Sequence, residues 1–314
     1  MKKPLKIVLG VPTYKRPVGL RRVLASIARL ELDQETELRV VVAENDLDGR
    51  QGVATVEEIR AGGFPFPIET VLSTARGISQ ARNALMNAAF SDPETDMLAM
   101  VDDDQWMEPI WLERLVAMQR QTEATVVGGY TLPDFEGQAL TWELKLPVYW
   151  RKKRRHGKVP MIEGTCGVLF TRKILDYCAD GYFDEKFSLI GGEDKEFFTR
   201  ILHRGCTFAF ADDAIAYEVF EADRRSLAWA KRRAYRIGAS DMRASLVRSR
   251  NPLDKIEQIA KIFAGFLRGG WRYVTGYFSP EQRMRAQLLL LRSAGKLSTL
   301  FGLRYESYRN TSGK

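Results

Sequence analysis

The sequence predicts an α/β fold in which a mainly parallel sheet is flanked by helices and followed by a helical, basic extension at the C-terminus. Short β-branched runs alternate with amphipathic helical patterns through the first half of the chain, which is typical of βαβ units. Beyond about residue 221 the strand pattern disappears. We therefore expect two domains, residues 1–220 and residues 221–314.

The first half of the chain supplies most of the predicted sheet. We expect strands at Leu5–Val11, Leu38–Ala43, Ile68–Leu72 and Met97–Val101, and helices at Val18–Leu30, Gly52–Ala61 and Ile78–Phe90. Later elements are a strand at Met161–Phe170, a short helix at Arg172–Tyr177 and a helix at Glu193–Arg204. Because functional groups in such sheets gather at the carboxyl ends of the strands, the residues that follow these strands are candidates for a site.

The composition limits the class of protein. With 314 residues, 45% of them hydrophobic, the chain can bury a large core. Its three cysteines have no CxxC zinc spacing and are too few for a disulfide framework, which fits a reducing, cytoplasmic compartment. The first apolar run is cut by Gly10 and Pro12, too soon for a secretory signal. No apolar stretch reaches the roughly 18 residues that a spanning helix needs.

Charge is distributed unevenly along the chain. Residues 221–314 hold 20 Lys and Arg against 7 Asp and Glu, a net charge of +13, whereas the preceding residues hold 28 against 33, a net charge of −5. This basic tail indicates attraction to a polyanion such as anionic lipid, a diphosphate or nucleic acid. Its cations lie around Trp229 and Tyr235 and include Arg224, Arg225, Lys231, Arg232, Arg233 and Arg236. A second basic run, residues 151–155, is either a solvated loop or a contact for phosphates.

An amphipathic helix is expected within the tail, at residues 254–268. The apolar residues at helical spacing are Ile256, Ile259, Ile262, Phe263, Phe266 and Leu267. Aromatic residues follow at once, at Trp271, Tyr273, Tyr277 and Phe278. This helix either packs on its own domain or lies in the surface of a membrane with its cations at the headgroups.

Three consecutive acids follow an apolar strand. Asp102, Asp103 and Asp104 carry like charges that repel one another, and a bound cation is the usual remedy. Oxygen ligands without a nearby histidine favour Mg²⁺ or Mn²⁺. Alternation along an extended segment would point Asp102 and Asp104 the same way and Asp103 the opposite way. Otherwise the run is an acidic turn that caps a helix.

A second acidic motif, Gly191-Gly192-Glu193-Asp194, opens a predicted helix. The glycines allow a tight turn, and the acids stand at the positive end of the helix. These acids either stabilise the helix N-terminus, or one carboxylate faces a cleft and takes a proton from an acceptor hydroxyl.

Two further motifs precede these acids, Val11 to Arg16 (VPTYKR) and Gly77 to Asn83 (GISQARN). In order and spacing the four motifs resemble the inverting family 2 glycosyltransferases of the GT-A fold, over about residues 5–220. The resemblance implies a Rossmann-like sheet and transfer of a sugar from a nucleoside diphosphate donor with inversion. An α-linked donor would then give a β-linked product.

The resemblance also implies residues that bind the donor. Pro12 and Thr13 lie in the first loop, which contacts the donor base. Glu44 stands where the family usually has an aspartate that reads the uracil ring, so a UDP-linked donor is expected. Arg82 matches an arginine of the family near the nucleotide; otherwise it is a surface or salt-bridged arginine.

The acids receive roles by the same match. Asp102 and Asp104 match the DxD pattern, so Asp102 would face the donor ribose or sugar and Asp104 the Mg²⁺ or Mn²⁺ and the diphosphate. Asp103, between them, belongs to the donor-binding run. Asp194 matches the base of the family.

On the acceptor side we expect Gly164 and Thr165, in a segment that the family uses there, together with Glu193. Glu218 stands where the family often has a metal-binding histidine, and it is either an oxygen ligand or an ordinary strand-edge residue. The organisation is similar to bacterial transferases that extend polyprenyl diphosphate-linked exopolysaccharide repeat units. We therefore expect a saccharide or lipid-linked saccharide acceptor, attachment to the inner face of the cell membrane, and no nucleic-acid partner.

Two other functions stay open. A sugar-phosphate nucleotidyltransferase also needs paired acids, but it usually has a glycine-rich phosphate loop that the segment from Gly10 to Gly19 lacks. A non-enzymatic protein that binds nucleic acid would use the basic, aromatic tail, yet it leaves the acids unexplained. The GxGxxG and GxxxxGK[ST] motifs of dehydrogenases and P-loop enzymes are absent.

Overall fold

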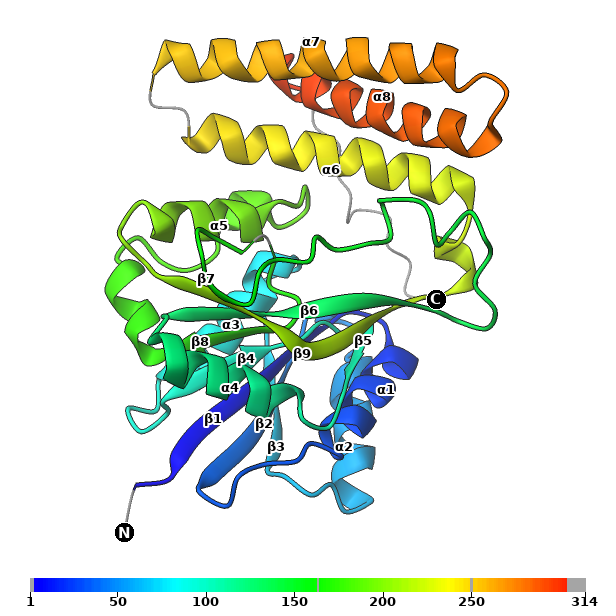
Figure 1. The fold of residues 1–314 in the computed structure, drawn as a ribbon. Helices are drawn as coiled ribbons and strands as arrows, with labels where there is room; N and C mark the ends of the chain where they lie inside the picture. Colours follow the sequence, from blue (N-terminus) through cyan, green and yellow to red (C-terminus); the bar gives the residue numbers. More distant parts are fainter. Residues whose placement is uncertain (1–2, 163, 249–250, 304–314) are drawn as a thin grey trace.

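A single mixed sheet forms the centre of the protein (Figure 1). The computed structural model describes residues 3–162, 164–248 and 251–303. Its strands are β1 (Leu5–Thr13), β2 (Thr36–Glu44), β3 (Ile68–Leu72), β4 (Met97–Met100), β5 (Gln105–Met107), β6 (Val126–Phe135), β7 (Gly157–Val159), β8 (Val168–Thr171) and β9 (Phe208–Phe220). They are ordered β3-β2-β1-β4-β8-β6-β9-β5, and β7 pairs with β9. The α/β prediction is confirmed.

The sheet is parallel only where βαβ units build it. Strands β3, β2, β1 and β4 are parallel, as predicted. Beyond them β8 runs antiparallel to both β4 and β6, and β5 and β7 run antiparallel to β9. Parallel pairing returns between β6 and β9. The expectation of a mainly parallel sheet therefore describes the N-terminal half, and the second half is mixed.

Helices cover both faces of the sheet. They are α1 (Pro17–Ile27), α2 (Gln51–Ala61), α3 (Ile78–Phe90), α4 (Trp111–Thr122), α5 (Glu193–Leu202), α6 (Leu227–Arg248), α7 (Pro252–Thr275) and α8 (Pro280–Leu300). Three short 3-10 turns are η1 (Arg172–Tyr177), η2 (Glu185–Phe187) and η3 (Ala222–Arg224). Among the described residues, no helix has the length and apolar character needed to cross a membrane.

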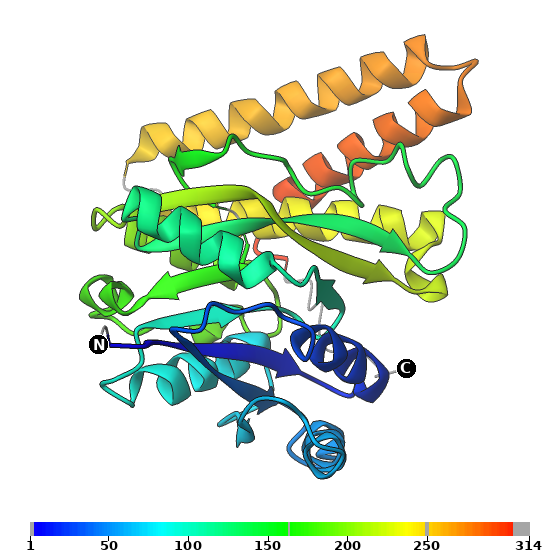
Figure 2. The same ribbon diagram turned by 60° about the horizontal axis from the view of Figure 1, so that its bottom comes forward.

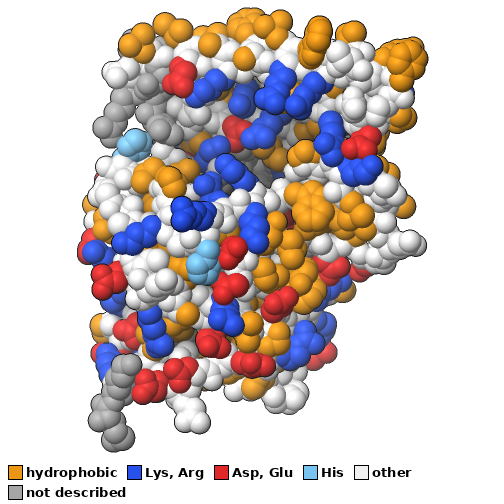
Figure 3. Space-filling model, in the orientation of Figure 1, with side chains coloured by type: hydrophobic (Ala, Val, Ile, Leu, Met, Phe, Trp, Pro, Cys, Tyr) orange, Lys and Arg blue, Asp and Glu red, His pale blue; other side chains and the backbone are white. Residues whose placement is uncertain are grey.

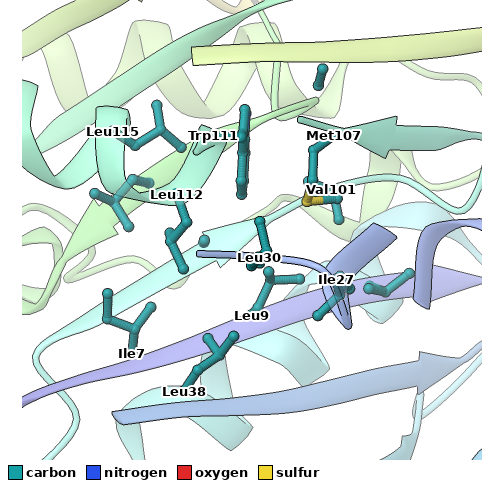
Figure 4. Close-up of a cluster of buried hydrophobic side chains, with 14 of the residues drawn as sticks. Ile7, Leu9, Ile27, Leu30, Leu38, Val101, Met107, Trp111, Leu112 and Leu115 are labelled. Carbon is teal, nitrogen blue, oxygen red and sulfur yellow. The ribbon is translucent and has the colours of Figure 1, made fainter. Parts of the chain in front are cut away.

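The core explains this layering. Side chains of a strand alternate between its two faces, so Ile7 and Leu9 of β1 pack with α1 and α4 while Val8 packs with α3 and α5. Figure 4 shows the first of these clusters around Leu9 and Trp111, both fully buried. Burial on both faces requires the nearly continuous apolar runs that made β1, β2 and β4 predictable.

One predicted strand is wrong over most of its length. The segment Met161–Phe170 becomes a strand only from Val168, as β8. Gly167 has a φ of 72°, in the left-handed region that a strand cannot use, and the chain turns there. The predicted short helix Arg172–Tyr177 is the 3-10 turn η1, and α5 ends at Leu202, two residues before its predicted end.

The helices α6, α7 and α8 lie together on one side of the molecule (Figures 1 and 2). The last strand, β9, ends at Phe220, and contacts continue across the predicted boundary. Trp229 of α6 stacks on Tyr149 with ring centroids 5.6 Å apart, and Tyr149 packs against Phe220. Arg225 binds both carboxylate oxygens of the buried Glu143 at 2.8 Å. The first part of the tail is therefore packed on the sheet.

Close backbone contact joins α6 to α8, and it predicts different effects for two glycine substitutions. A Cβ at Gly295 of α8 would overlap the carbonyl oxygen of Tyr235, whereas a Cβ at Gly270 of α7 would meet no atom within 4 Å. Gly295→Ala should lower the free energy of unfolding by about 1–3 kcal/mol through overpacking. Gly270→Ala, the matched control, should keep or raise it because alanine favours helices. Thermal and urea unfolding measure both, and equal effects would contradict the packing.

Candidate active site

A cleft of about 1150 Å³ lies between the carboxyl ends of the strands and helix α6. Figure 3 shows Lys and Arg side chains gathered around this hollow below the C-terminal helices. Ten of the site residues considered in the sequence analysis line it: Pro12, Thr13, Arg82, Asp102, Asp103, Asp104, Gly164, Glu193, Asp194 and Glu218. Two predicted residues, Glu44 and Thr165, do not. The fold therefore brings segments far apart in the sequence to one place.

Asp103 fixes the loop after β1 to the loop after β4. Its carboxylate accepts hydrogen bonds from the Thr13 hydroxyl at 2.9 Å and the Tyr14 backbone N–H at 3.4 Å. The Arg16 guanidinium contacts its other oxygen at 3.3 Å. Burial raises the pKa of Asp103, and the Arg16 charge opposes this rise. The contacts assign Asp103 a part in shaping the first loop.

Asp104 lies between two guanidinium groups. Arg16 Nη1 is 3.0 Å and Arg224 Nη1 is 2.7 Å from the same oxygen, Oδ2. Burial, opposed by Arg16 and reinforced by neighbouring carboxylates, raises the pKa of Asp104 to about 7. The expected alternation of the three acids is wrong, because Asp103 and Asp104 form a turn and share Arg16. Alternation holds only for an extended chain.

Arg82 connects the two acidic motifs. This residue of α3 is buried, and its Nη1 binds Glu193 Oε1 while its Nη2 lies 3.3 Å from Asp102 Oδ1. Its guanidinium also lies over the ring of Phe183, 5.8 Å from the centroid. The charge of Arg82 therefore acts on both motifs at once, and the side chain is positioned by contacts on several sides.

Two glycines set up the acids at the start of α5. Gly191 and Gly192 have φ values of 76° and 97°, which only glycine adopts without strain, so the predicted tight turn is confirmed. Burial raises the pKa of Asp194, against the charges of Arg82 and Arg151, and burial raises the pKa of Glu193 to about 7. Such shifts help a carboxylate to accept a proton near neutral pH.

The space beside Asp194 is kept open by a missing side chain. A Cβ at Gly164 would lie 3.5 Å from Asp194 Oδ2. The other oxygen, Oδ1, accepts the backbone N–H of Lys195 at 2.7 Å. Among the described residues, Glu193 Oε2 and the Thr165 hydroxyl are buried without a hydrogen-bond partner. Buried polar atoms of this kind usually have a partner, and for Glu193, which lines the cleft, a ligand hydroxyl is a suitable one.

Glu44 is completely buried behind the cleft. Its two oxygens accept the backbone N–H groups of Asp46 at 2.8 Å and Gly52 at 2.6 Å, which fixes the loop after β2 to the start of α2. The next residue, Asn45, lines the cleft. A direct contact of Glu44 with a donor base stays a prediction, whereas its support of this loop is visible.

Two arginines that the sequence analysis assigned to phosphates, to a polyanion or to a solvated loop pair with an acid in the cleft. Glu218 of β9 accepts hydrogen bonds from Arg151 at 2.8 Å and Arg233 at 3.0 Å, one on each oxygen. Burial opposes ionisation, but these two charges lower the pKa of Glu218 to about 2. Arg151 thus lines the cleft while its side chain stays partly exposed to solvent. The sequence did hold one signal: Glu218 is an acid that interrupts an apolar strand. A buried acid of this kind needs a cation beside it, and Arg151 is one such partner.

Three potential metal ligands also meet outside the cleft. His156, Asp212 and Asp213 place one ligand atom each within 4.8 Å of one another, and this is the sole such group among the described residues. Lys153 already pairs with Asp212 at 3.2 Å; His156 and Asp213 are exposed and Asp212 is half-buried. The group is an ion-pair cluster at the edge of β9.

Comparison with known proteins agrees with this geometry. Residues 4–237 match the model of the glycosyltransferase-like family 2. The succinoglycan biosynthesis protein ExoM of Rhizobium meliloti (strain 1021) is 32% identical over 312 residues, which cover 96% of this chain and 94% of ExoM. Both findings cover most of the chain.

Solved structures share the fold. The mannosyltransferase PcManGT from Pyrobaculum calidifontis, in complex with GDP-Man and Mn²⁺, has a TM-score of 0.63 at 17% identity and covers 95% of this chain and 88% of its own. TarS of S. aureus, residues 1–349 in complex with UDP-GlcNAc, has a TM-score of 0.51 at 15% identity and covers 96% and 93%. With the family match and the relative ExoM, these findings show that the chain belongs to glycosyltransferase family 2, has the GT-A fold and transfers a sugar.

Proposed function

We propose that this glycosyltransferase moves one hexose from a UDP-linked donor to a hydroxyl of a saccharide acceptor and inverts the anomeric configuration. We propose further that the acceptor is an oligosaccharide on polyprenyl diphosphate, used for cell-surface polysaccharide at the cytoplasmic face of the membrane. The observation that carries the proposal is the meeting of Asp102, Asp104 and Asp194 in one cleft, where Arg82 pairs with Asp102 and with Glu193, the neighbour of Asp194. The relative ExoM, a succinoglycan biosynthesis protein, supports the type of product.

The donor is assigned to the side of the cleft formed by β1, β2 and β4. Pro12, Thr13 and Asn45 line this side, and Asp102 follows β4. The similar structures of TarS and PcManGT hold UDP-GlcNAc and GDP-Man, which supports a nucleotide sugar as donor. A nucleotide at the carboxyl ends of strands is the usual arrangement in open α/β sheets.

A divalent cation fits at Asp104. Asp104 is a hard oxygen ligand near other carboxylates; Arg16 and Arg224 occupy its Oδ2, and its Oδ1 has no hydrogen-bond partner in the described part of the chain. Mg²⁺ or Mn²⁺ held there would act as a Lewis acid on the diphosphate. Among the described residues Asp102 and Glu218 make no ligand cluster with Asp104, so a cation held there would take further ligands from the diphosphate. The Mn²⁺ in the PcManGT structure supports this assignment.

Asp194 is assigned as the base. A carboxylate removes the proton of the attacking hydroxyl best when its pKa is raised toward the working pH, and burial has this effect on Asp194. The gap left by Gly164 provides room for a sugar ring next to Asp194 Oδ2. Attack from the face opposite the departing diphosphate, in a single displacement, inverts the configuration.

The basic wall of the cleft suits the rest of the acceptor. Arg232 and Arg236 of α6 line the cleft with Lys152 and Arg154, which come from the run at residues 151–155. A diphosphate that links an oligosaccharide to a lipid carries charges that guanidinium groups bind well. We therefore assign this wall to the diphosphate end of a lipid-linked acceptor.

A scan of UDP-, GDP- and dTDP-sugars tests the donor and the cation. We expect release of nucleoside diphosphate from a UDP-sugar that depends on Mg²⁺ or Mn²⁺. Asp104→Asn should reduce this release by about 10²-fold or more, because the charge on the leaving group loses its counterion. The control Asp212→Asn changes an acid outside the cleft and should keep the activity. Release of inorganic pyrophosphate, or no metal-dependent release with lipid-linked acceptor present, would contradict the proposal.

The base is tested by Asp194→Asn. We expect kcat to fall by about 10²–10⁴-fold while the affinity for the donor is unchanged, since an amide cannot accept the proton. Glu196→Gln is the matched control: Glu196 is on the same helix, pairs with Arg200 at 2.8 Å and does not line the cleft. Steady-state kinetics and calorimetric titration with the donor measure both quantities. If Asp194→Asn kept wild-type kcat, or if Glu196→Gln lost as much, the assignment would be wrong.

A further inference from the structure

Helix α7 presents an apolar face that no described part of the chain covers. Figure 3 shows hydrophobic side chains along the edge of the molecule that α7 forms. The exposed apolar residues of the helix recur every three or four positions and are 40–76% exposed: Leu253, Ile256, Ile259, Phe263, Leu267, Trp271 and Val274. The adjoining turn adds Tyr277 and Phe278, which are 61% and 95% exposed. Monomeric proteins seldom expose a continuous apolar row of this length without a use for it.

The opposite face of α7 is fixed to α8. Ile262 is buried there, and a Cβ at Gly265 or Gly269 would overlap Ser293 or Leu290 of α8. Each helical residue turns by about 100°, so the buried residues and the apolar row lie on different sides of the helix. The apolar row therefore cannot turn inward without breaking the contact with α8.

Cations line one flank of the apolar row. Lys261, Arg268 and Arg272 follow at intervals of seven and four residues, which places them on one side of the helix. All three are exposed, and Lys261 pairs with Glu257 at 2.5 Å. Arg268 and Arg272 form no ion pair within residues 3–162, 164–248 and 251–303. An apolar face flanked by cations, with aromatic residues at one end, is typical of helices that lie in the surface of an anionic membrane.

We propose that α7 is the membrane-contact element of this protein and lies flat in the headgroup region of an anionic bilayer. The apolar row enters the acyl boundary, and Lys261, Arg268 and Arg272 contact lipid phosphates. The net charge of +13 on residues 221–314 favours a bilayer over a second copy of the chain, because two copies repel each other there.

This inference rests on the proposed function in one respect: membrane contact would give the enzyme access to the proposed lipid-linked acceptor. Its structural basis is separate, because none of the α7 residues lines the cleft. Membrane contact through α7 would keep the cleft beside α6 close to the bilayer surface. Vesicle binding can therefore be measured without turnover, and Asp104→Asn should bind vesicles as the wild type does whether or not the proposed chemistry is correct.

Vesicle flotation of the full chain tests the proposal. The wild type should float at low salt with vesicles of equal parts phosphatidylcholine and phosphatidylglycerol, and much less with phosphatidylcholine alone. Leu267→Glu/Trp271→Glu should reduce binding about tenfold or more, since two apolar side chains leave the bilayer. Val18→Glu/Leu144→Glu makes the same charge change at exposed positions elsewhere and should bind as the wild type. Circular dichroism and thermal unfolding establish that each variant is folded.

Three results would overturn the proposal. The first is failure of the wild type to float with anionic vesicles, or equal flotation with neutral ones. The second is unchanged flotation of the folded Leu267→Glu/Trp271→Glu variant. The third is a wild type that is a dimer in light scattering and does not float with vesicles, while the Leu267→Glu/Trp271→Glu variant is a monomer. Helix α7 would then be a contact between two copies of the chain.

Discussion

The site depends on one buried guanidinium, that of Arg82. It lies between Asp102, which follows β4, and Glu193, which begins α5, and it contacts both. Without this positive charge the carboxylates would be buried close together, and an unpaired buried charge costs about 3–5 kcal/mol. Arg82 therefore fixes the position of α5 relative to the sheet and, with it, the position of Asp194.

The same balance extends into the C-terminal helices. Arg224 and Arg233, which follow the last strand, contact Asp104 and Glu218. The positive charges of the basic tail thus stabilise the acids of the cleft, in addition to any attraction of the tail to a polyanionic partner. The parts of the tail face different ways: the turn η3 and helix α6 face the acids, whereas α7 turns its apolar row outward. The tail is therefore not one membrane-binding unit, because only α7 presents an apolar face to the outside.

The first four strands and their helices could be predicted because burial on both faces demands continuous apolar runs. The strand β6 could not, since Gly128, Gly129 and Pro133 interrupt its apolar pattern, and its pairing with β9 includes a register shift. In the site, motif spacing identified acids that the fold does gather. Motif spacing could not show that Glu44 accepts hydrogen bonds from backbone N–H groups, or that Arg151, within a run of basic residues, pairs with Glu218.

We propose that a single displacement, with Asp194 as base, transfers the sugar across this cleft. The most direct measurement is the anomeric configuration of the product formed from an α-linked nucleotide sugar, read from the NMR coupling constant of the new glycosidic proton. We expect a β-linked product. An α-linked product would require a second displacement or another geometry, and it would contradict the role given to Asp194.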